Sequence, residues 1–173
     1  RMQQIRNAAV PAVEKMQLLH NEASFNSSIR ELYITDMNGL VHNLDGTLIS
    51  YNTAEWFKTS ISGKDSVTEP YIDKTIGNIL VATCSVPVYD DNQRIIGVLG
   101  ADIPGLWFSE QIKDIVVGKT GYCYVDGLDG TNIADPDPQI VQSMWNTVTN
   151  AKNDSSLQSL AAFEKIALQT DSS

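Results

Sequence analysis

The sequence predicts an α+β fold in which a long N-terminal helix leads into modules built on short antiparallel strands. Three observations support this. Apolar residues recur at helical spacing over residues 2–25, an apolar–polar alternation then replaces that pattern, and clusters of turn-forming residues separate the alternating segments. The 173 residues, of which 42% are hydrophobic and 19% charged, suffice for one compact domain or two small modules.

The N-terminal segment is expected to be helical over residues 2–25. Its apolar side chains recur at helical spacing, with Gln, Arg, Glu and Lys between them. They are Ile5, Ala8, Ala9, Ala12, Met16 and Leu19. Pro11 falls within this pattern and should kink or interrupt the helix, because proline lacks a backbone N–H and its ring clashes with the preceding turn.

A hairpin is expected over residues 30–43, where Asp-Met-Asn-Gly forms a turn inside the run RELYITDMNGLVHN. A short helix should follow over residues 54–61, with Asn52 or Thr53 as its N-cap and Gly63 at its end. Three strands with turn residues between them come next in the pattern. They are predicted at about residues 66–73, 78–89 and 94–103, with turns at 74–77 and 90–93.

The second half repeats part of this order. A helix is expected over residues 105–119, with Trp107, Ile112 and Ile115 forming an apolar stripe. A second hairpin follows over residues 120–137, and its D-x-x-D-G turn is similar enough to the first hairpin to suggest a duplicated module.

Residues 139–169 are predicted to be helical, and no strands return after them, so the second module is expected to be incomplete. The predicted divisions are an N-terminal helix, a first module and an incomplete second module. They cover residues 1–27, 28–115 and 116–173.

The charge of the chain excludes some classes of function. A net charge of −9 and a pI of about 4.5 argue against a nucleic-acid surface, which needs a patch of Lys and Arg. Cys84 and Cys123 lie in apolar strand-like runs and are expected to be buried free thiols. His20 and His42 are expected to face solvent, and we expect neither a metal nor a cofactor. Turn chemistry accounts for the acids at 36, 126 and 129.

The order of elements and two runs, SVPVYDDNQRIIGVLGADI and VGKTGYCYVDGLDGTNIADPDP, resemble the double Cache (dCache) sensor domains of chemoreceptors and sensor histidine kinases. The resemblance covers roughly residues 28–138. It implies a PAS-like ligand-binding module far from the membrane and a second module close to it. It also implies a parent chain anchored in the cell membrane, with this domain extracellular or periplasmic, and a homodimer formed through the N-terminal helix. No enzymatic activity is implied.

The resemblance also implies a ligand pocket. Many such domains that bind amino acids hold the ligand with an Arg two residues before a Trp, a following aromatic residue, a Tyr and two Asp. The matching positions here, with a nearby Tyr that is out of register, are Trp56, Phe57, Tyr71, Asp73, Asp102 and Tyr51. The Arg position is Ala54, and Lys58 and Lys64 are expected to face solvent. Carboxylates and aromatic faces favour a cation, so an amine or amino-acid-like ligand is expected.

Other readings of the same residues stay open at this point. Trp56 and Phe57 could be ordinary core aromatics, Asp102 a cap or turn residue at the end of a strand, and Asp73 a turn residue. The paired carboxylates could also serve an α+β hydrolase as acid and base. A third possibility is a structural sensor module that binds no ligand.

Overall fold

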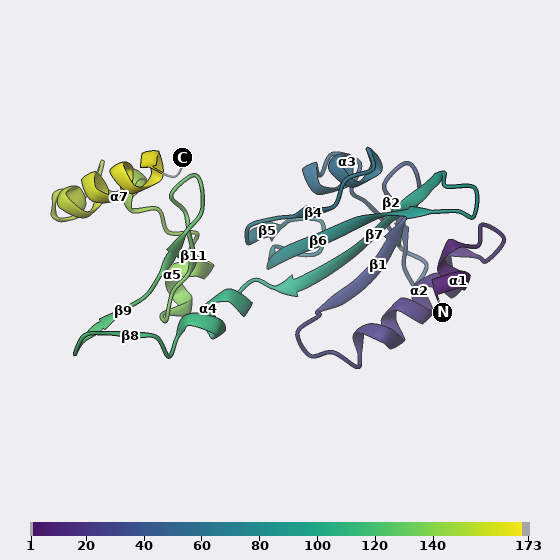
Figure 1. The fold of residues 1–173 in the computed structure, drawn as a ribbon, viewed down its shortest axis with the longest axis horizontal. Helices are drawn as coiled ribbons and strands as arrows, with labels where there is room; N and C mark the ends of the chain where they lie inside the picture. The colour runs from purple at the N-terminus through teal and green to yellow at the C-terminus, as the bar shows by residue number, and fades with distance from the viewer. Residues whose placement is uncertain (1, 171–173) are drawn as a thin grey trace. The chain divides into compact units, whose positions relative to one another are not determined.

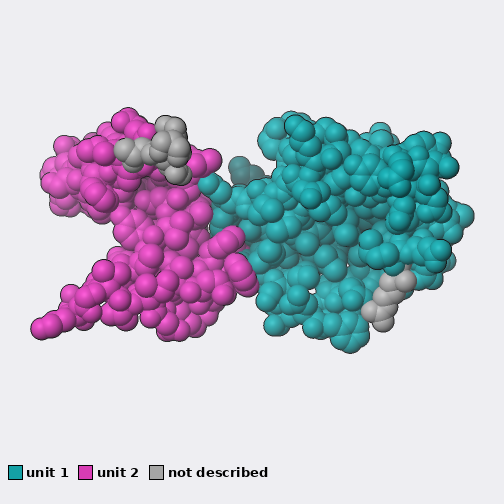
Figure 2. Space-filling model, in the orientation of Figure 1, with its two compact units in different colours: residues 1–104 teal, residues 105–173 magenta. Residues whose placement is uncertain are grey.

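The computed structural model describes residues 2–170, without the side chain of Thr170. The described residues form two compact units, residues 2–104 (unit 1) and 105–170 (unit 2), shown in teal and magenta in Figure 2. The mixture of helices and antiparallel strands confirms the predicted α+β class (Figure 1). The helix α4 (Trp107–Ile112) belongs to unit 2.

Unit 1 contains a seven-stranded antiparallel sheet in the order β3-β2-β1-β7-β6-β4, with β5 also paired to β6. The helix α3 lies on one face of this sheet, and α1 and α2 lie on the other (Figure 1). The elements of unit 1 are α1 (Met2–Arg6), α2 (Ala12–Ala23), β1 (Glu31–Thr35), β2 (Leu40–His42), β3 (Leu48–Ser50), α3 (Glu55–Ile61), β4 (Ser66–Val67), β5 (Tyr71–Asp73), β6 (Ile79–Tyr89) and β7 (Ile95–Pro104).

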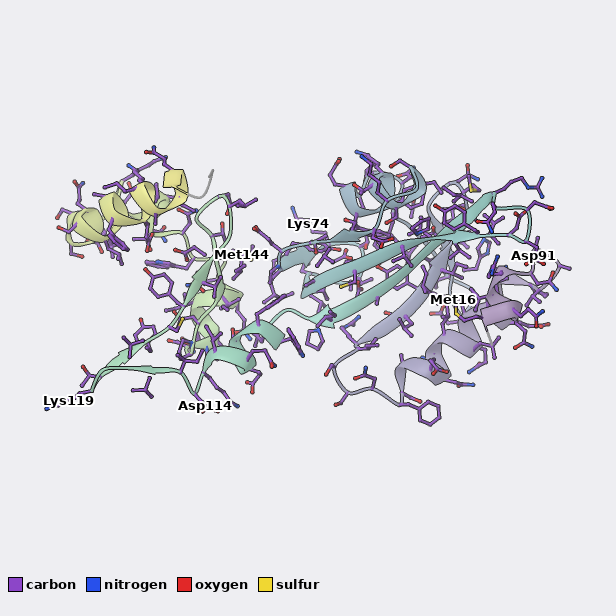
Figure 3. The ribbon with its side chains drawn as sticks, in the orientation of Figure 1. Met16, Lys74, Asp91, Asp114, Lys119 and Met144 are labelled. Atoms are coloured by element: carbon purple, nitrogen blue, oxygen red, sulfur yellow. The ribbon has the colours of Figure 1, made fainter. Side chains whose placement is uncertain are left out.

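The N-terminal segment forms two helices, and the predicted interruption at Pro11 is confirmed, because Pro11 lies immediately before α2. The Asn7 side chain accepts a hydrogen bond from the backbone N–H of Ala9 at 2.9 Å, which turns the chain between the helices. Arg6 ties α1 to the sheet by donating to the carbonyl oxygens of Tyr89 and Asp90 at 2.8 and 3.1 Å. Met16 on α2 packs into the core beneath the sheet (Figure 3).

The first hairpin and the strands predicted at about 78–89 and 94–103 lie where they were predicted, but the strand predicted at 66–73 forms two short strands, β4 and β5, that pair separately with β6. Asp36 fixes the first turn by accepting backbone hydrogen bonds from Asn38 and Leu40 at 2.8 and 2.9 Å. The expected cap of α3 is wrong, because Ala54 occupies the N-cap position and makes no side-chain capping bond. The strand β6 is the longest of the sheet and pairs with β4, β5 and β7, and Lys74 and Asp91 lie in the turns at its two ends (Figure 3).

Unit 2 contains two two-stranded antiparallel sheets, β8 with β9 and β10 with β11, together with several short helices and one longer helix. Its elements are α4 (Trp107–Ile112), β8 (Val116–Val117), β9 (Gly121–Tyr122), β10 (Val125–Asp126), β11 (Asn132–Ala134), α5 (Pro138–Gln142), α6 (Thr147–Asn150), a 3₁₀ turn η1 (Ser155–Leu157) and α7 (Gln158–Thr170).

Two helix predictions for unit 2 were too long. The helix expected over 105–119 ends at Ile112, because the β-branched pair Val116–Val117 turns back at Gly118, whose φ is 65°. The helix expected over 139–169 is broken into four pieces. Asn146 starts a new helix by accepting a hydrogen bond from the Thr149 backbone at 2.8 Å, and Asp154 caps η1 in the same way.

Candidate ligand-binding site

The register of the sheet brings the predicted site residues to one face. Asp102 on β7 lies opposite Thr83 on β6, and Tyr71 lies opposite Val81, two residues before Thr83. On β1, Tyr33 lies opposite Gly100, two residues before Asp102. Alternate residues of a strand, and residues directly opposite in paired strands, project from the same face. This face is the one that α3 covers, as the contacts of Trp56 show.

An aromatic cluster forms the buried wall of the site. Tyr33 and Tyr51 stack with ring centroids 5.4 Å apart, and the Trp56 ring lies 5.0 Å from Tyr51 and 5.9 Å from Tyr33. Gly100 leaves room for this stack, because a Cβ atom there would lie 2.4 Å from Cε2 of Tyr33. Burial raises the pKa of both tyrosines well above the usual range, so they remain neutral phenols.

Asp102 is the most buried acid of the site, with 0% of its surface exposed. Its Oδ1 accepts hydrogen bonds from the hydroxyls of Tyr33 at 3.0 Å and Thr83 at 2.8 Å. No described group pairs with its Oδ2. Burial raises the pKa of Asp102 to about 6, the two hydroxyls lower it, and the nearby charge of Asp73 raises it. Asp102 is therefore a buried acid of the site rather than only a strand-end cap.

The two carboxylate oxygens of Asp73 have different surroundings. Its Oδ1 closes the turn after β5 by accepting from the backbone N–H of Thr75 at 2.7 Å and from the Thr75 hydroxyl. Its Oδ2 is buried and has no hydrogen-bond partner in the described part of the chain. The expectation that Asp73 acts only as a turn residue therefore accounts for one oxygen alone.

The third polar atom without a partner belongs to Trp56. Its Nε1 is buried and makes no hydrogen bond of ordinary geometry within residues 2–170. The indole lies close enough to Tyr71 to lower the pKa of that phenol, which burial raises. The Tyr71 hydroxyl itself lies 2.9 Å from that of Thr83, which in turn donates to Asp102. Tyr71, Thr83 and Asp102 thus form one connected polar group next to Trp56, and Asp73 lies near enough for its charge to raise the pKa of Asp102.

Phe57 and Ala54 pack in the hydrophobic core next to Trp56. Phe57 is buried and lies perpendicular to Trp56, with centroids 6.2 Å apart, and its ring reaches the hairpin turn at Gly39. Ala54 packs against the core in the position where the family's signature has Arg. Lys58 is exposed and ion-paired with Glu55 at 2.6 Å, and Lys64 is exposed, as predicted.

Sequence reasoning missed three residues of the site: Tyr33, Thr75 and Thr83. Tyr33 lies between two apolar residues in the first strand, and Thr83 lies inside the apolar run ILVATCSVPV, so each resembled an ordinary strand residue. A polar residue within a buried strand needs a partner, and this was the available signal for Thr83. Cys84 and Cys123 are free thiols but only partly buried, which corrects the expected full burial.

The site as a whole offers acceptors and negative charge, which suits a ligand that donates hydrogen bonds and carries positive charge. Among the described residues, no group of three or more His, Cys, Asp or Glu side chains is arranged to hold a metal ion. Across residues 2–170, the helices are too short or too polar to cross a membrane.

Comparison with known proteins places the chain among sensor domains. It is 34% identical over 87 residues to the methyl-accepting chemotaxis protein PscA of Pseudomonas syringae pv. tomato, covering 50% of this chain and 14% of that protein. It is 36% identical over 90 residues to citrate (Re)-synthase of Syntrophus aciditrophicus, covering 44% of this chain and 14% of that protein. The chain therefore spans about one seventh of the length of these two curated relatives.

The fold resembles that of a chemoreceptor ligand-binding domain. The Tlp3 domain of Campylobacter jejuni, solved in complex with 4-methylisoleucine, superposes with a TM-score of 0.60 at 21% identity, covering 81% of this chain and 60% of that one. The family model described as "Cache domain" (dCache_1) matches residues 1–170. The chain therefore belongs to the Cache-domain family of ligand-binding sensor domains, which are not enzymes.

Proposed function

We propose that unit 1 senses an organic amine on behalf of a membrane-anchored receptor. One observation carries this proposal. Oδ2 of Asp102 and Oδ2 of Asp73 are buried, and neither oxygen has a hydrogen-bond partner within the described residues. Buried polar atoms are nearly always paired, so two orphaned carboxylate oxygens on the same face of the sheet point to an occupant.

The hydrogen-bonding capacity of these atoms favours an ammonium group. The two carboxylate oxygens accept and cannot donate when ionised, and an ammonium donates without accepting. The two acids also repel each other, as the effect of Asp73 on the pKa of Asp102 shows, and a cation between them removes that repulsion. The rings of Trp56 and Tyr71 add cation–π attraction of about 0.5–2 kcal/mol.

The missing basic residue separates an amine from a standard amino acid. A buried ligand carboxylate is costly without a cationic partner, and Ala54 provides none. Lys58, Lys64 and Lys74 are exposed. The Trp56 N–H can donate to a single neutral or anionic acceptor on the ligand. We infer that the preferred ligand has an ammonium group and at most one such acceptor, which distinguishes it from the amino acid bound to Tlp3.

Signalling in this proposal is a shift between two conformations of unit 1. Ligand binding draws α3 and β5 toward β7, and the movement reaches α1 through Arg6, which holds the turn after β6. The proposal keeps residues 28–115 as the module far from the membrane and residues 116–173 as the module near it. It also includes an extracellular or periplasmic location and a homodimer formed through the N-terminal helices.

Isothermal titration calorimetry tests the ligand class. Putrescine and other small amines should bind. L-serine and succinate should bind at least about tenfold more weakly, because each carries a carboxylate for which the site has no cationic partner. A tenfold difference in affinity corresponds to about 1.4 kcal/mol. Asp102→Asn should abolish amine binding, because it removes the buried charge while keeping the size of the side chain. The matched control is Asp65→Asn, which removes an exposed acid of the same unit and should leave the affinity unchanged.

Two outcomes would contradict the proposal. A dicarboxylate or a sugar that binds equally well to the Asp102→Asn variant would show that the ligand class is wrong. A crystal grown with putrescine and showing only water beside Trp56, Tyr71 and Asp102 would favour a structural module that binds no ligand.

A further inference from the structure

A groove of about 410 Å³ lies within unit 2, between the β10–β11 hairpin and the helix α7. The hairpin contributes one wall and the helix the other. The residues that matter here are Tyr124, Asp126, Gly127 and Leu128 on the hairpin side, and Phe163 and Glu164 on α7. The volume falls within the usual range for small-molecule sites, which is roughly 300–1,000 Å³.

Glu164 is the central feature of the groove. Only 4% of its surface is exposed, and its Oε1 accepts a hydrogen bond from the Tyr124 hydroxyl at 3.3 Å. Its Oε2 is buried without a hydrogen-bond partner in residues 2–170. Leaving a buried carboxylate oxygen unpaired is costly, so the groove is built to receive a donor.

A second orphaned acceptor lies beside the groove. Asn132 is 5% exposed, and its Oδ1 has no partner within the described region, while its amide bonds to Asp126 and lowers the pKa of that acid. Burial, followed by the charge of Glu164, raises the pKa of Asp126 to about 6. Asp126 was expected to be a turn residue, but it lies in β10, close to the like charge of Glu164. The group is therefore rich in acceptors and in negative charge.

The neighbouring lysine does not neutralise this charge from the groove side. Lys165 follows Glu164 on α7 but lines a different groove, with Val148 and Ala161 on the other side of the helix. Glu164 and Asp126 are only two carboxylates, and no group of three or more His, Cys, Asp or Glu side chains in the described residues could hold a metal ion. The rings of Tyr124 and Phe163 lie along the same groove and suit an organic cation better than a metal ion.

We propose that this groove is a second ligand site, for a small organic ammonium ion. The ammonium donates to Oε2 of Glu164 and lies against the rings of Tyr124 and Phe163. The site is distinct from the one in unit 1, because all its residues belong to unit 2. It goes beyond the proposed function of unit 1 and stands whether or not that function is correct.

The test uses the chain of residues 1–173 labelled with ¹⁵N, in the Asp102→Asn background that silences unit 1. Putrescine and methylammonium are titrated, and amide shifts are followed by NMR. We expect the amides of residues 124–128 and 160–168 to shift. Adding Glu164→Gln should weaken binding at least about tenfold, because truncating one partner of a buried charge pair is costly. The matched control, Asp114→Asn, removes an exposed acid on the far side of unit 2 from α7 (Figure 3).

The outcomes separate this proposal from the function proposed for unit 1. Groove shifts that the Glu164→Gln change weakens and the control leaves intact support the second site. Absence of groove shifts at millimolar probe overturns it, and so do equal affinities for Glu164→Gln and its parent. Binding of n-butanol as tightly as putrescine would also overturn it, since the groove would then be merely apolar. In the wild-type background, shifts confined to unit 1 overturn this proposal and leave the first one standing.

Discussion

Each unit contains a buried acid, but the two acids accept different numbers of hydrogen bonds from neighbouring hydroxyls. In unit 1, Asp102 lies on a central strand, and two hydroxyls donate to one of its oxygens at 3.0 and 2.8 Å. In unit 2, Glu164 lies on a helix and has one hydroxyl donor at 3.3 Å. Each acid keeps one oxygen without a partner among the described residues. The first site is therefore more strongly preorganised than the second.

The aromatic residues beside the two acids also differ, because those of unit 1 are more deeply buried than Phe163 of unit 2. Trp56 and Phe57 are 3% and 5% exposed and pack into the core of unit 1, whereas Phe163 on the groove of unit 2 is 64% exposed. A buried aromatic wall fixes the shape of a site, but an exposed ring is free to adjust. This contrast predicts a selective site in unit 1 and a more permissive one in unit 2.

The largest expected effect comes from truncating the buried aromatic wall. Trp56→Ala should lower the free energy of unfolding of unit 1 by about 3–5 kcal/mol, because it leaves a large cavity against Tyr33 and Tyr51. Phe163→Ala is the counterpart in unit 2 and should cost less than about 1 kcal/mol. Urea unfolding combined with amide exchange, in β6 and β7 for unit 1 and in α7 for unit 2, measures both. Equal losses would show that the two sites do not differ in packing.

The next effect is electrostatic and depends on pH. The pKa of folded Asp102 is about 6, above the value of 3.8 for an unperturbed Asp, so the folded state binds the proton more tightly. The contribution is favourable below pH 3.8 and is lost as the pH rises through 6. Without ligand, Asp102→Asn should therefore stabilise unit 1 by about 1–3 kcal/mol at pH 7.5.

The stabilisation by Asp102→Asn should shrink toward zero near pH 4, where Asp102 is protonated in the wild type. Urea unfolding at both pH values measures it. Asp126→Asn should show the same sign with a smaller size, because Asp126 is only half-buried and solvent screens its charge. A variant that is less stable than wild type at pH 7.5 would mean that the Asp102 charge is compensated within the unliganded protein.

The sequence was most informative where local chemistry decides the structure. The first hairpin, the two long strands of the sheet and the class of the fold could be predicted, because alternation and turn residues act over a few positions. The helix expected over residues 139–169 could not. The caps at Asn146 and Asp154 restart helices that the apolar spacing alone would continue.

The site was partly predictable for a similar reason. Trp56, Tyr71, Asp73 and Asp102 follow a spacing that a family resemblance can carry. Tyr33 and Thr83 become part of the site only through strand register, which pairs them with Gly100 and Asp102 at long separations in the chain. Such pairings depend on the whole sheet, and no short pattern encodes them. The groove in unit 2 was missed because Asp126 and Glu164 lie on different elements.

The smallest predicted effect tests the hydrogen bonds themselves. Tyr33→Phe removes a donor from fully buried Asp102 and should cost about 1–2 kcal/mol, as expected for a hydrogen bond to a charged group. It should also raise the pKa of Asp102 further, because the Tyr33 hydroxyl lowers it. Tyr124→Phe removes the longer bond to Glu164 and should cost about 0.5 kcal/mol or less, since Tyr124 is only half-buried.

Urea unfolding of the two tyrosine variants, with Tyr122→Phe as an exposed control, measures this difference. The pH dependence of amine binding gives a second readout for unit 1. The pH at which affinity falls should move upward in Tyr33→Phe, because Asp102 then takes up its proton at higher pH. If Tyr124→Phe proved as costly as Tyr33→Phe, Glu164 would be held as firmly as Asp102. The groove of unit 2 would then be as preorganised as the site of unit 1, and the predicted difference in selectivity would not hold.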